Sequence, residues 1–168
     1  RLISFTNPWA DPLGTGYQLT NALMAFGRGE WFGVGLGHSI QKMSYLPEAH
    51  TDFMLAILAE EFGFFGITTV MILSFLMVAA CIKIGHRALR HQYLRAGYLA
   101  YGISIIFLLQ IIVNAGMNLG MLPTKGLTLP FISYGGSSLI MCAVMVSLML
   151  KIDATTQEKN TSKEESSF

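Results

Sequence analysis

Three long stretches without a charged residue constrain the fold of this chain more than any other feature. They cover residues 63–82, 96–118 and 130–150. The hydrocarbon core of a bilayer is about 30 Å thick, and a helix of roughly 20 apolar residues crosses it. The composition agrees, since 52% of the residues are hydrophobic and 12% are charged. The sequence therefore predicts an all-α, polytopic membrane protein with three transmembrane helices.

The basic residues predict the orientation of these spans. Lys83, Arg87, Arg90 and Arg95 lie between the first two spans, and Lys151 follows the third. Because Lys and Arg collect on the cytoplasmic side, these segments are expected inside, and residues 1–62 and 119–129 outside. Residues 151–168 are rich in Ser, Thr, Glu and Lys, so a disordered cytoplasmic tail is expected.

Other features narrow the class of protein. A net charge of +1 without a basic face argues against nucleic-acid binding. The chain starts at Arg1 without a methionine or a signal peptide, so we expect the C-terminal piece of a longer protein. Cys81 and Cys142 lie inside apolar runs and lack the spacing of a metal site or a disulfide framework.

The predicted outer segment, residues 1–62, contains an amphipathic pattern. Leu19, Ala22, Leu23 and Phe26 follow a spacing of i, i+3, i+4 and i+7, which predicts a helix over 17–27 that lies along the membrane interface. The glycine-rich residues 27–37 that follow predict a turn-rich loop anchored by aromatic side chains.

Polar residues gather directly before the first span. Glu48, His50 and Asp52 lie in LPEAHTDF, and a helix starting near Asp52 would extend beyond the membrane over 52–62. This extension keeps Glu60 and Glu61 out of the hydrocarbon centre. Asp52 has two interpretations, a helix cap or a functional acid.

The other two spans are also polar at their predicted outer ends. Gln110, Asn114 and Asn118 recur every four residues and form a stripe, which either lines a cavity or makes hydrogen bonds between helices. Lys125 is a lone cation on the outer side, which either binds substrate or reaches lipid head groups. Hydroxyl groups start the third span, at Ser133, Tyr134, Ser137 and Ser138.

These groups predict a polar cleft that opens to the outer leaflet. It would contain Asp52 as an acid, Lys125 with Lys42 or Arg28 as cations, and the amides and hydroxyls named above. Such a set suits an anionic lipid head group that carries hydroxyls, with the acid as general base and the cations on phosphate.

Three motifs resemble one known family. NPWADPLGTGYQL (7–19), YLPEAHTDF (45–53) and PTKGLTLPFISYGGSSL (123–139) are similar to the SEDS proteins of bacterial shape, elongation, division and sporulation. The AFGRG of 25–29 and the PTKGLTLP of 123–130 favour the cell-division branch, FtsW. The resemblance covers residues 1–153. It implies an inner-membrane peptidoglycan glycosyltransferase that polymerises lipid II at the septum, beside a class B penicillin-binding protein and other division proteins.

The resemblance also implies roles for single residues. Asp52 matches the essential aspartate of the family and Lys125 the lysine of its PTKG motif, while Glu48 and His50 take supporting roles. Asp52 would deprotonate the acceptor 4-hydroxyl, and Lys125, with Lys42 or Arg28, would stabilise the pyrophosphate leaving group of an inverting reaction.

Three questions stay open at this stage. A divalent cation, Mg²⁺ or Mn²⁺, would suit the pyrophosphate, but no ligand set is identifiable. A lipid II flippase is one rival function, although the predicted inner half at 139–150 is almost bare of polar groups. A division scaffold without catalytic activity is the other.

Overall fold

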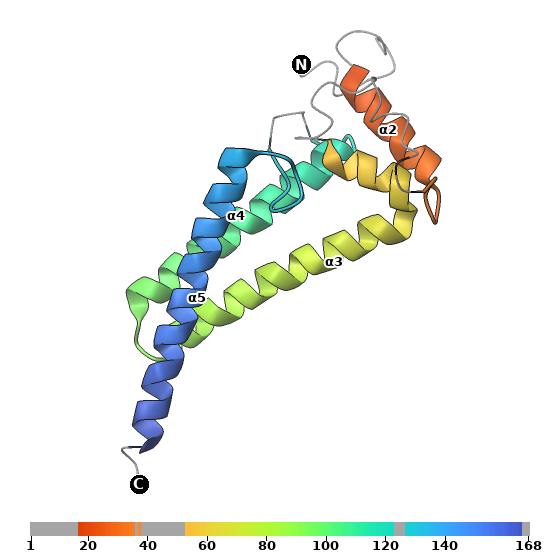
Figure 1. Ribbon diagram of the computed structural model, residues 1–168. Helices are drawn as coiled ribbons and strands as arrows, with labels where there is room; N and C mark the ends of the chain where they lie inside the picture. Colours follow the sequence, from red (N-terminus) through yellow and green to blue (C-terminus); the bar gives the residue numbers. More distant parts are fainter. Residues whose placement is uncertain (1–16, 36, 38–52, 123–126, 166–168) are drawn as a thin grey trace. The chain divides into compact units, whose positions relative to one another are not determined.

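The computed structural model describes residues 17–35, 37, 53–122 and 127–165, and all its regular elements there are helices. They are α2 (Tyr17–Gly29), α3 (Met54–Arg90), α4 (Leu94–Asn118) and α5 (Gly136–Glu165) (Figure 1). Three helical segments are long and apolar enough to cross a membrane, namely α3, α4 and Gly136–Glu158 of α5. The predicted fold class, an all-α polytopic membrane protein, is confirmed.

The chain divides into two compact units. Unit 1 comprises Arg1–Leu73 and Gln110–Gly135, and unit 2 comprises Ser74–Leu109 and Gly136–Phe168. Unit 1 therefore contains α2, the first part of α3 and the end of α4. Unit 2 contains the rest of α3 and α4, together with α5.

The core of unit 1 joins α2 to the start of α3. Ala22 and Ala25 of α2 are fully buried and cluster with Phe53, Ala56 and Ile57. The predicted helix over 17–27 is thus present, and its apolar face packs on protein because small side chains on both helices permit a close approach.

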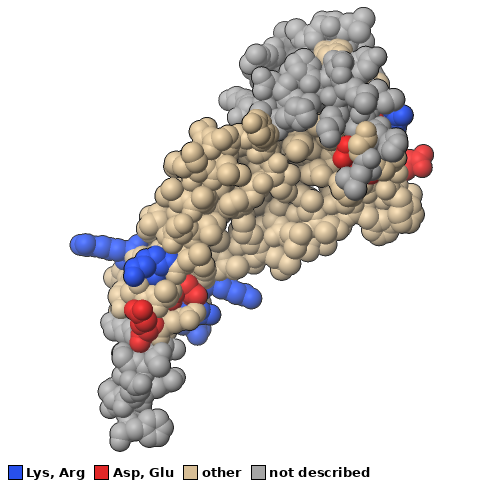
Figure 2. Space-filling model, in the orientation of Figure 1, with Lys and Arg blue, Asp and Glu red and all other residues tan. Residues whose placement is uncertain are grey.

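Unit 2 is held together by small residues and by polar contacts at its charged end. A Cβ placed on Gly85 would lie 3.3 Å from the Cβ of Ala100, so α3 and α4 pack tightly there. Figure 2 shows the Lys and Arg side chains of this unit gathered at one end, next to a surface without charged residues. Large apolar side chains of unit 2 are exposed, among them Leu76, Ile105, Ile140 and Leu148, as expected for helices in lipid.

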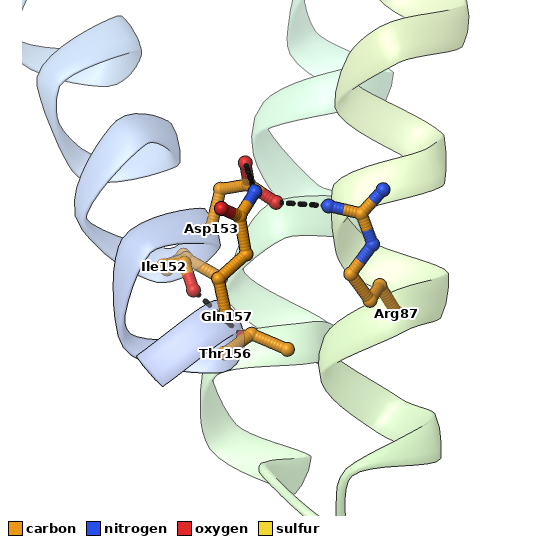
Figure 3. Close-up of polar contacts among 5 residues, drawn as sticks. All are labelled: Arg87, Ile152, Asp153, Thr156 and Gln157. Atoms are coloured by element: carbon orange, nitrogen blue, oxygen red, sulfur yellow. Dashed lines mark hydrogen bonds and ion pairs between the residues drawn. The ribbon is translucent and has the colours of Figure 1, made fainter. Parts of the chain in front are cut away.

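At this charged end, α5 continues far beyond its apolar part. Arg87 Nη1 donates a 2.7 Å hydrogen bond to Asp153 Oδ1, and Gln157 Nε2 donates one of 2.7 Å to Asp153 Oδ2 (Figure 3). Ile152 and Thr156, one helical turn apart, are buried. The helix runs to Glu165, whereas the composition of residues 151–168 suggested a disordered tail. The buried side chains of Ile152 and Thr156 and the Arg87–Asp153 ion pair stabilise this part of the helix. Composition alone does not reveal such contacts.

Candidate active site

The predicted site residues fall into two groups. Five of them, Lys42, Glu48, His50, Asp52 and Lys125, lie outside the described residues, and their roles stay predictions. The other six are described, and we place them below: Arg28, Gln110, Asn114, Asn118, Ser133 and Ser137.

Helix α3 is interrupted at Gly63, close to its predicted outer end. The backbone there has φ 65° and ψ −160°, which is not helical. In an unbroken helix, the Phe64 amide would donate to the Glu60 carbonyl, and the Phe65 amide to the Glu61 carbonyl. Both bonds are replaced, and four backbone groups of α3 need other partners.

The loop after α2 supplies those partners. Val34 N donates to Glu60 O at 2.9 Å, and Gly35 N donates to Glu61 O at 3.2 Å. On the other side of the break, Phe64 N donates to Glu30 O at 2.9 Å. Phe65 N donates to the Trp31 carbonyl at 3.3 Å, which completes the set. Residues 30–35, which we call the inserted loop, therefore occupy a gap in the hydrogen-bond ladder of α3. Irregular backbone is tolerated near a membrane only when its polar groups are satisfied in this way.

Two glycines make this insertion sterically feasible. A Cβ on Gly63 would lie 2.7 Å from Gly29 O and from Phe32 N, and the positive φ at Gly63 itself favours glycine. Gly33 has φ 78°, and a Cβ there would lie 2.6 Å from Phe62 N. Residues 30–35 thus form a loop, as predicted, whereas residues 27–29 of the predicted loop belong to α2, and this loop is built into a break in α3.

Two neighbouring carboxylates lie at the break, and both are buried. The side chain of Glu60 is fully buried and lies 3.5 Å from Arg28, measured from Oε1 to Nη1. Gly37 N donates a 3.2 Å hydrogen bond to Glu61 Oε1. Arg28, predicted to bind pyrophosphate, is half-exposed and paired with Glu60 in this structure. Sequence reasoning assigned Glu60 and Glu61 no role, although two adjacent acids followed by Phe-Gly in an apolar helix are an available signal.

Exposed aromatic rings surround the inserted loop. The ring centroids of Trp31 and Phe64 are 5.4 Å apart, as are those of Phe32 and Phe65. All four side chains are more than half exposed. Aromatic residues concentrate at the membrane–water interface, so this cluster fits the level where the apolar part of α3 begins.

The amide stripe of α4 binds backbone in unit 1. Asn114 Nδ2 donates a 2.6 Å hydrogen bond to Leu127 O, in the connection between α4 and α5. Asn118 Nδ2 donates to Asn114 O at 2.9 Å. Both side chains are fully buried, whereas Gln110 is half-buried and its Oε1 accepts no hydrogen bond within the described part of the chain. In this structure the two asparagines hydrogen-bond backbone carbonyls, and their contact with substrate stays a prediction.

The predicted hydroxyl groups separate into two environments. Ser133 is buried in unit 1, where its Oγ accepts a 2.8 Å hydrogen bond from Leu129 N and fixes the turn before α5. Ser137 and Tyr134 are exposed. Ser137 belongs to unit 2, so it carries no argument about the site in unit 1.

The described residues on either side of the two segments with the predicted catalytic and phosphate-binding residues all belong to unit 1. Gly37 and Phe53 flank the segment with Asp52, and Leu122 and Leu127 flank the segment with Lys125. Buried carboxylates and amides are costly in an apolar protein and tend to mark functional regions. Three apolar helices long enough to cross a membrane define the chain as part of a polytopic membrane protein.

Comparison with known proteins identifies the family. A family model described as "Cell cycle protein", that of FtsW, RodA and SpoVE, matches residues 1–158, and the chain belongs to this family. It is 80% identical over its whole length to a probable peptidoglycan glycosyltransferase FtsW of Acinetobacter baylyi, of which it covers 42%. It is 60% identical over 153 residues to the protein of the same name from Aeromonas salmonicida, covering 39% of it.

A solved structure is also similar. It comes from work titled "Structural coordination of polymerization and crosslinking by a peptidoglycan synthase complex". The TM-score is 0.68 and the sequence identity 27%, over 93% of this chain and 41% of that one. The resemblance to the SEDS family is therefore confirmed, and the chain spans about two fifths of the length of the relatives it matches.

Proposed function

We propose that the protein to which this chain belongs is a peptidoglycan glycosyltransferase that polymerises lipid II during septal wall synthesis. The observation that carries this proposal is the 80% identity, over all 168 residues, to a probable peptidoglycan glycosyltransferase FtsW. The similar solved structure, from a peptidoglycan synthase complex, supports a class B penicillin-binding protein as the partner. We place residues 1–62 outside the inner membrane and the C-terminus in the cytoplasm, following the distribution of Lys and Arg.

The proposed reaction uses one carboxylate. Asp52 accepts the proton of the acceptor 4-hydroxyl as that oxygen attacks the anomeric carbon of the donor. The bond to the lipid pyrophosphate breaks, and Lys125, with Lys42 or Arg28, stabilises the charge that develops there. Because pyrophosphate leaves without being protonated, a second catalytic acid is unnecessary, in contrast to ordinary glycoside hydrolysis.

A divalent cation, Mg²⁺ or Mn²⁺, is the expected counter-ion of the pyrophosphate. Within the described ranges, no three His, Cys, Asp or Glu side chains converge to hold one. We therefore assign it no protein ligand and derive no step through it. Polymerisation measured with each cation and with EDTA gives the metal dependence directly.

The first prediction tests the base. Full-length protein, reconstituted in vesicles with its transpeptidase partner and supplied with lipid II, should make glycan chains, and Asp52→Asn should make none. Lys125→Ala should lower the rate severely, by on the order of a hundredfold or more, because a preorganised charge on the leaving group is lost. Asp153→Asn serves as the matched control, since it removes a carboxylate from unit 2.

The same assay separates the rival functions. Polymer from Asp52→Asn at the wild-type rate would contradict the proposed base. Movement of lipid II across the vesicle membrane without polymer would identify a flippase. Neither polymer nor movement from the wild type, with partner recruitment intact, would identify a scaffold.

A further inference from the structure

The proposed reaction makes no use of the basic residues of unit 2. They lie near the end of α3, at the start of α4 and in α5, and they are Lys83, Arg87, Arg90, Arg95 and Lys151. Figure 2 shows Lys and Arg side chains together at this end of the unit. The positive-inside trend predicts on which side of the membrane such residues lie, but it does not say what they bind.

Contacts between the three helices bring these residues to one place. A Cβ on Gly97 would lie 2.5 Å from Leu89 Cδ2, so the end of α3 packs closely on the start of α4. The ion pair between Arg87 Nη1 and Asp153 Oδ1, 2.7 Å apart, joins the same end of α3 to α5. The basic residues of the three helices therefore belong to one surface.

Most of the positive charge on this surface is not neutralised by the chain itself. Arg87 is paired with Asp153, which leaves one fewer cation in need of a partner. Four other exposed cations form no ion pair with an acid in the part of the unit whose side chains the structure describes: Lys83, Arg90, Arg95 and Lys151. We call these four residues the basic cluster.

The basic cluster lies directly at the edge of the apolar surface. In each of the three helices an exposed apolar residue immediately precedes a cation: Ile82 before Lys83, Leu94 before Arg95, and Leu150 before Lys151. The three apolar side chains are 41%, 54% and 63% exposed. Because exposed apolar residues of a span face lipid and the cations of long side chains reach its head groups, the cluster lies at head-group depth.

Phosphate groups of lipids are the anions present at that depth. A phosphodiester accepts charge-assisted hydrogen bonds from ammonium and guanidinium groups, and each Lys or Arg near the surface adds to the attraction for an anionic membrane. A soluble acidic protein or a nucleic acid would instead meet cations that project beyond the apolar boundary. The position of the cluster therefore favours a lipid as its partner.

We propose that the basic cluster of Lys83, Arg90, Arg95 and Lys151 binds the head groups of anionic phospholipids, which supply the counter-ions that the described part of unit 2 lacks. In the proposed topology these lipids belong to the cytoplasmic leaflet. The inference goes beyond the proposed glycosyltransferase function and does not depend on it.

Two double substitutions of the same chemistry test the site in the full-length protein. Lys83→Gln with Lys151→Gln removes two cations of the cluster. Lys159→Gln with Lys163→Gln is the matched control, because these residues lie about 12 and 18 Å further along α5 than Lys151, beyond a screening length of about 8 Å at physiological salt. Lys83→Arg with Lys151→Arg keeps the charge and shows whether the two positions tolerate substitution.

The first measurement is the ratio of phosphatidylglycerol to phosphatidylcholine that remains bound after purification from mixed micelles containing equal amounts of both. We expect the wild type to be enriched in phosphatidylglycerol. The enrichment should fall by on the order of fivefold for each cluster cation removed, and it should persist in the tail control and in the arginine variant. High salt should lower the enrichment of the wild type, because the attraction is screened.

The second measurement is the thermal midpoint in phosphatidylcholine micelles after an addition. Phosphatidylglycerol should raise the midpoint of the wild type and raise it less in the cluster variant. Soluble glycerol 3-phosphate and the transpeptidase partner are added separately for comparison.

Four outcomes would overturn the proposal. The first is equal enrichment in the cluster variant and the wild type. The second is an equal loss in the tail control, since net charge alone would then explain it. A midpoint raised as much by glycerol 3-phosphate as by phosphatidylglycerol would identify a phosphate site without a lipid requirement. A midpoint that responds to the transpeptidase partner and not to phosphatidylglycerol would assign the cluster to a protein contact.

Discussion

Among single residues, Asn114 shows how a buried amide in an apolar helix is satisfied by its own chain. Its side chain is fully buried, and its Nδ2 donates to Leu127 O across a sequence separation of 13 residues. Leu127 lies two positions after Lys125. Asn114 therefore fixes the backbone just beyond the predicted lysine, and a contact with substrate is not needed to explain its presence.

Replacing Asn114 by leucine should destabilise the protein. The Leu127 carbonyl would lose the donor of a part-buried hydrogen bond, which costs about 1 kcal/mol for a typical contact of this kind. We expect a lower thermal midpoint for Asn114→Leu in detergent, with a smaller effect for Ser147→Ala. Ser147 is exposed, and its hydroxyl donates to a carbonyl of its own helix. An unchanged midpoint in Asn114→Leu would contradict the structural role.

At the scale of elements, α3 consists of two helical pieces joined through the inserted loop. The broken ladder has no unsatisfied groups at residues 60, 61, 64 and 65, because residues 30–35 bind all four. A kink of this kind normally has an identifiable cause, and here the cause is a loop that enters the helix at a glycine.

Gly63→Ala should disturb this junction. The added Cβ would lie 2.7 Å from two backbone atoms, and the backbone at Gly63 (φ 65°, ψ −160°) is in a region that is essentially restricted to glycine and costs other residues about 1–3 kcal/mol. We expect a clearly lower thermal midpoint and faster exchange of the amides at 34 and 35. Gly102→Ala is the control, because a Cβ there meets no atom within 4 Å, and its midpoint should stay equal or rise. Slow exchange in Gly63→Ala would contradict the steric argument.

The elements differ in how far the sequence predicted them. The three spans follow from charge-free runs because the bilayer imposes their length, and helix 17–27 follows from its periodicity. The break at Gly63 was missed, because hydrogen bonds between residues that are 26 or 34 positions apart leave no periodic signal. The helix over 151–165 was missed because Ile152 and Thr156 are too few to alter a polar composition.

For the site, the sequence identified which polar residues are present better than it identified their hydrogen-bond and ion-pair partners. The stripe of Asn114 and Asn118 exists as predicted from its spacing, but the acceptor of Asn114 is a distant carbonyl that spacing cannot show. Arg28 was assigned to phosphate from its charge alone, whereas its nearest acid, Glu60, becomes apparent only when α2 packs on α3.

At the scale of the whole molecule, the chain carries about two fifths of its relatives' length. In the proposed function, the rest of the protein would supply the other part of the lipid II site. The segments with the proposed base and the proposed cation are both bounded by unit 1, so this part is proposed to carry the reactive groups.

The 168-residue chain produced alone should therefore bind membranes but make no glycan. Lipid II polymerisation by the isolated chain and by the full-length protein, each with the transpeptidase partner, compares the two directly. We expect product only from the full-length protein, since positioning of both substrates contributes a large share of any such rate. Chains of glycan from the short form would show that the site is complete within it.

The inserted loop also has a consequence for biosynthesis. Residues 30–35 leave the ribosome before residues 60–65, and in the proposed topology they must be translocated first. The nascent α3 thus meets its partners for the Glu60 and Glu61 carbonyls only if the earlier segment has already been exported. In the proposed topology, a delay in exporting residues 30–35 would leave the Glu60 and Glu61 carbonyls without the amide donors that pair with them in the folded protein.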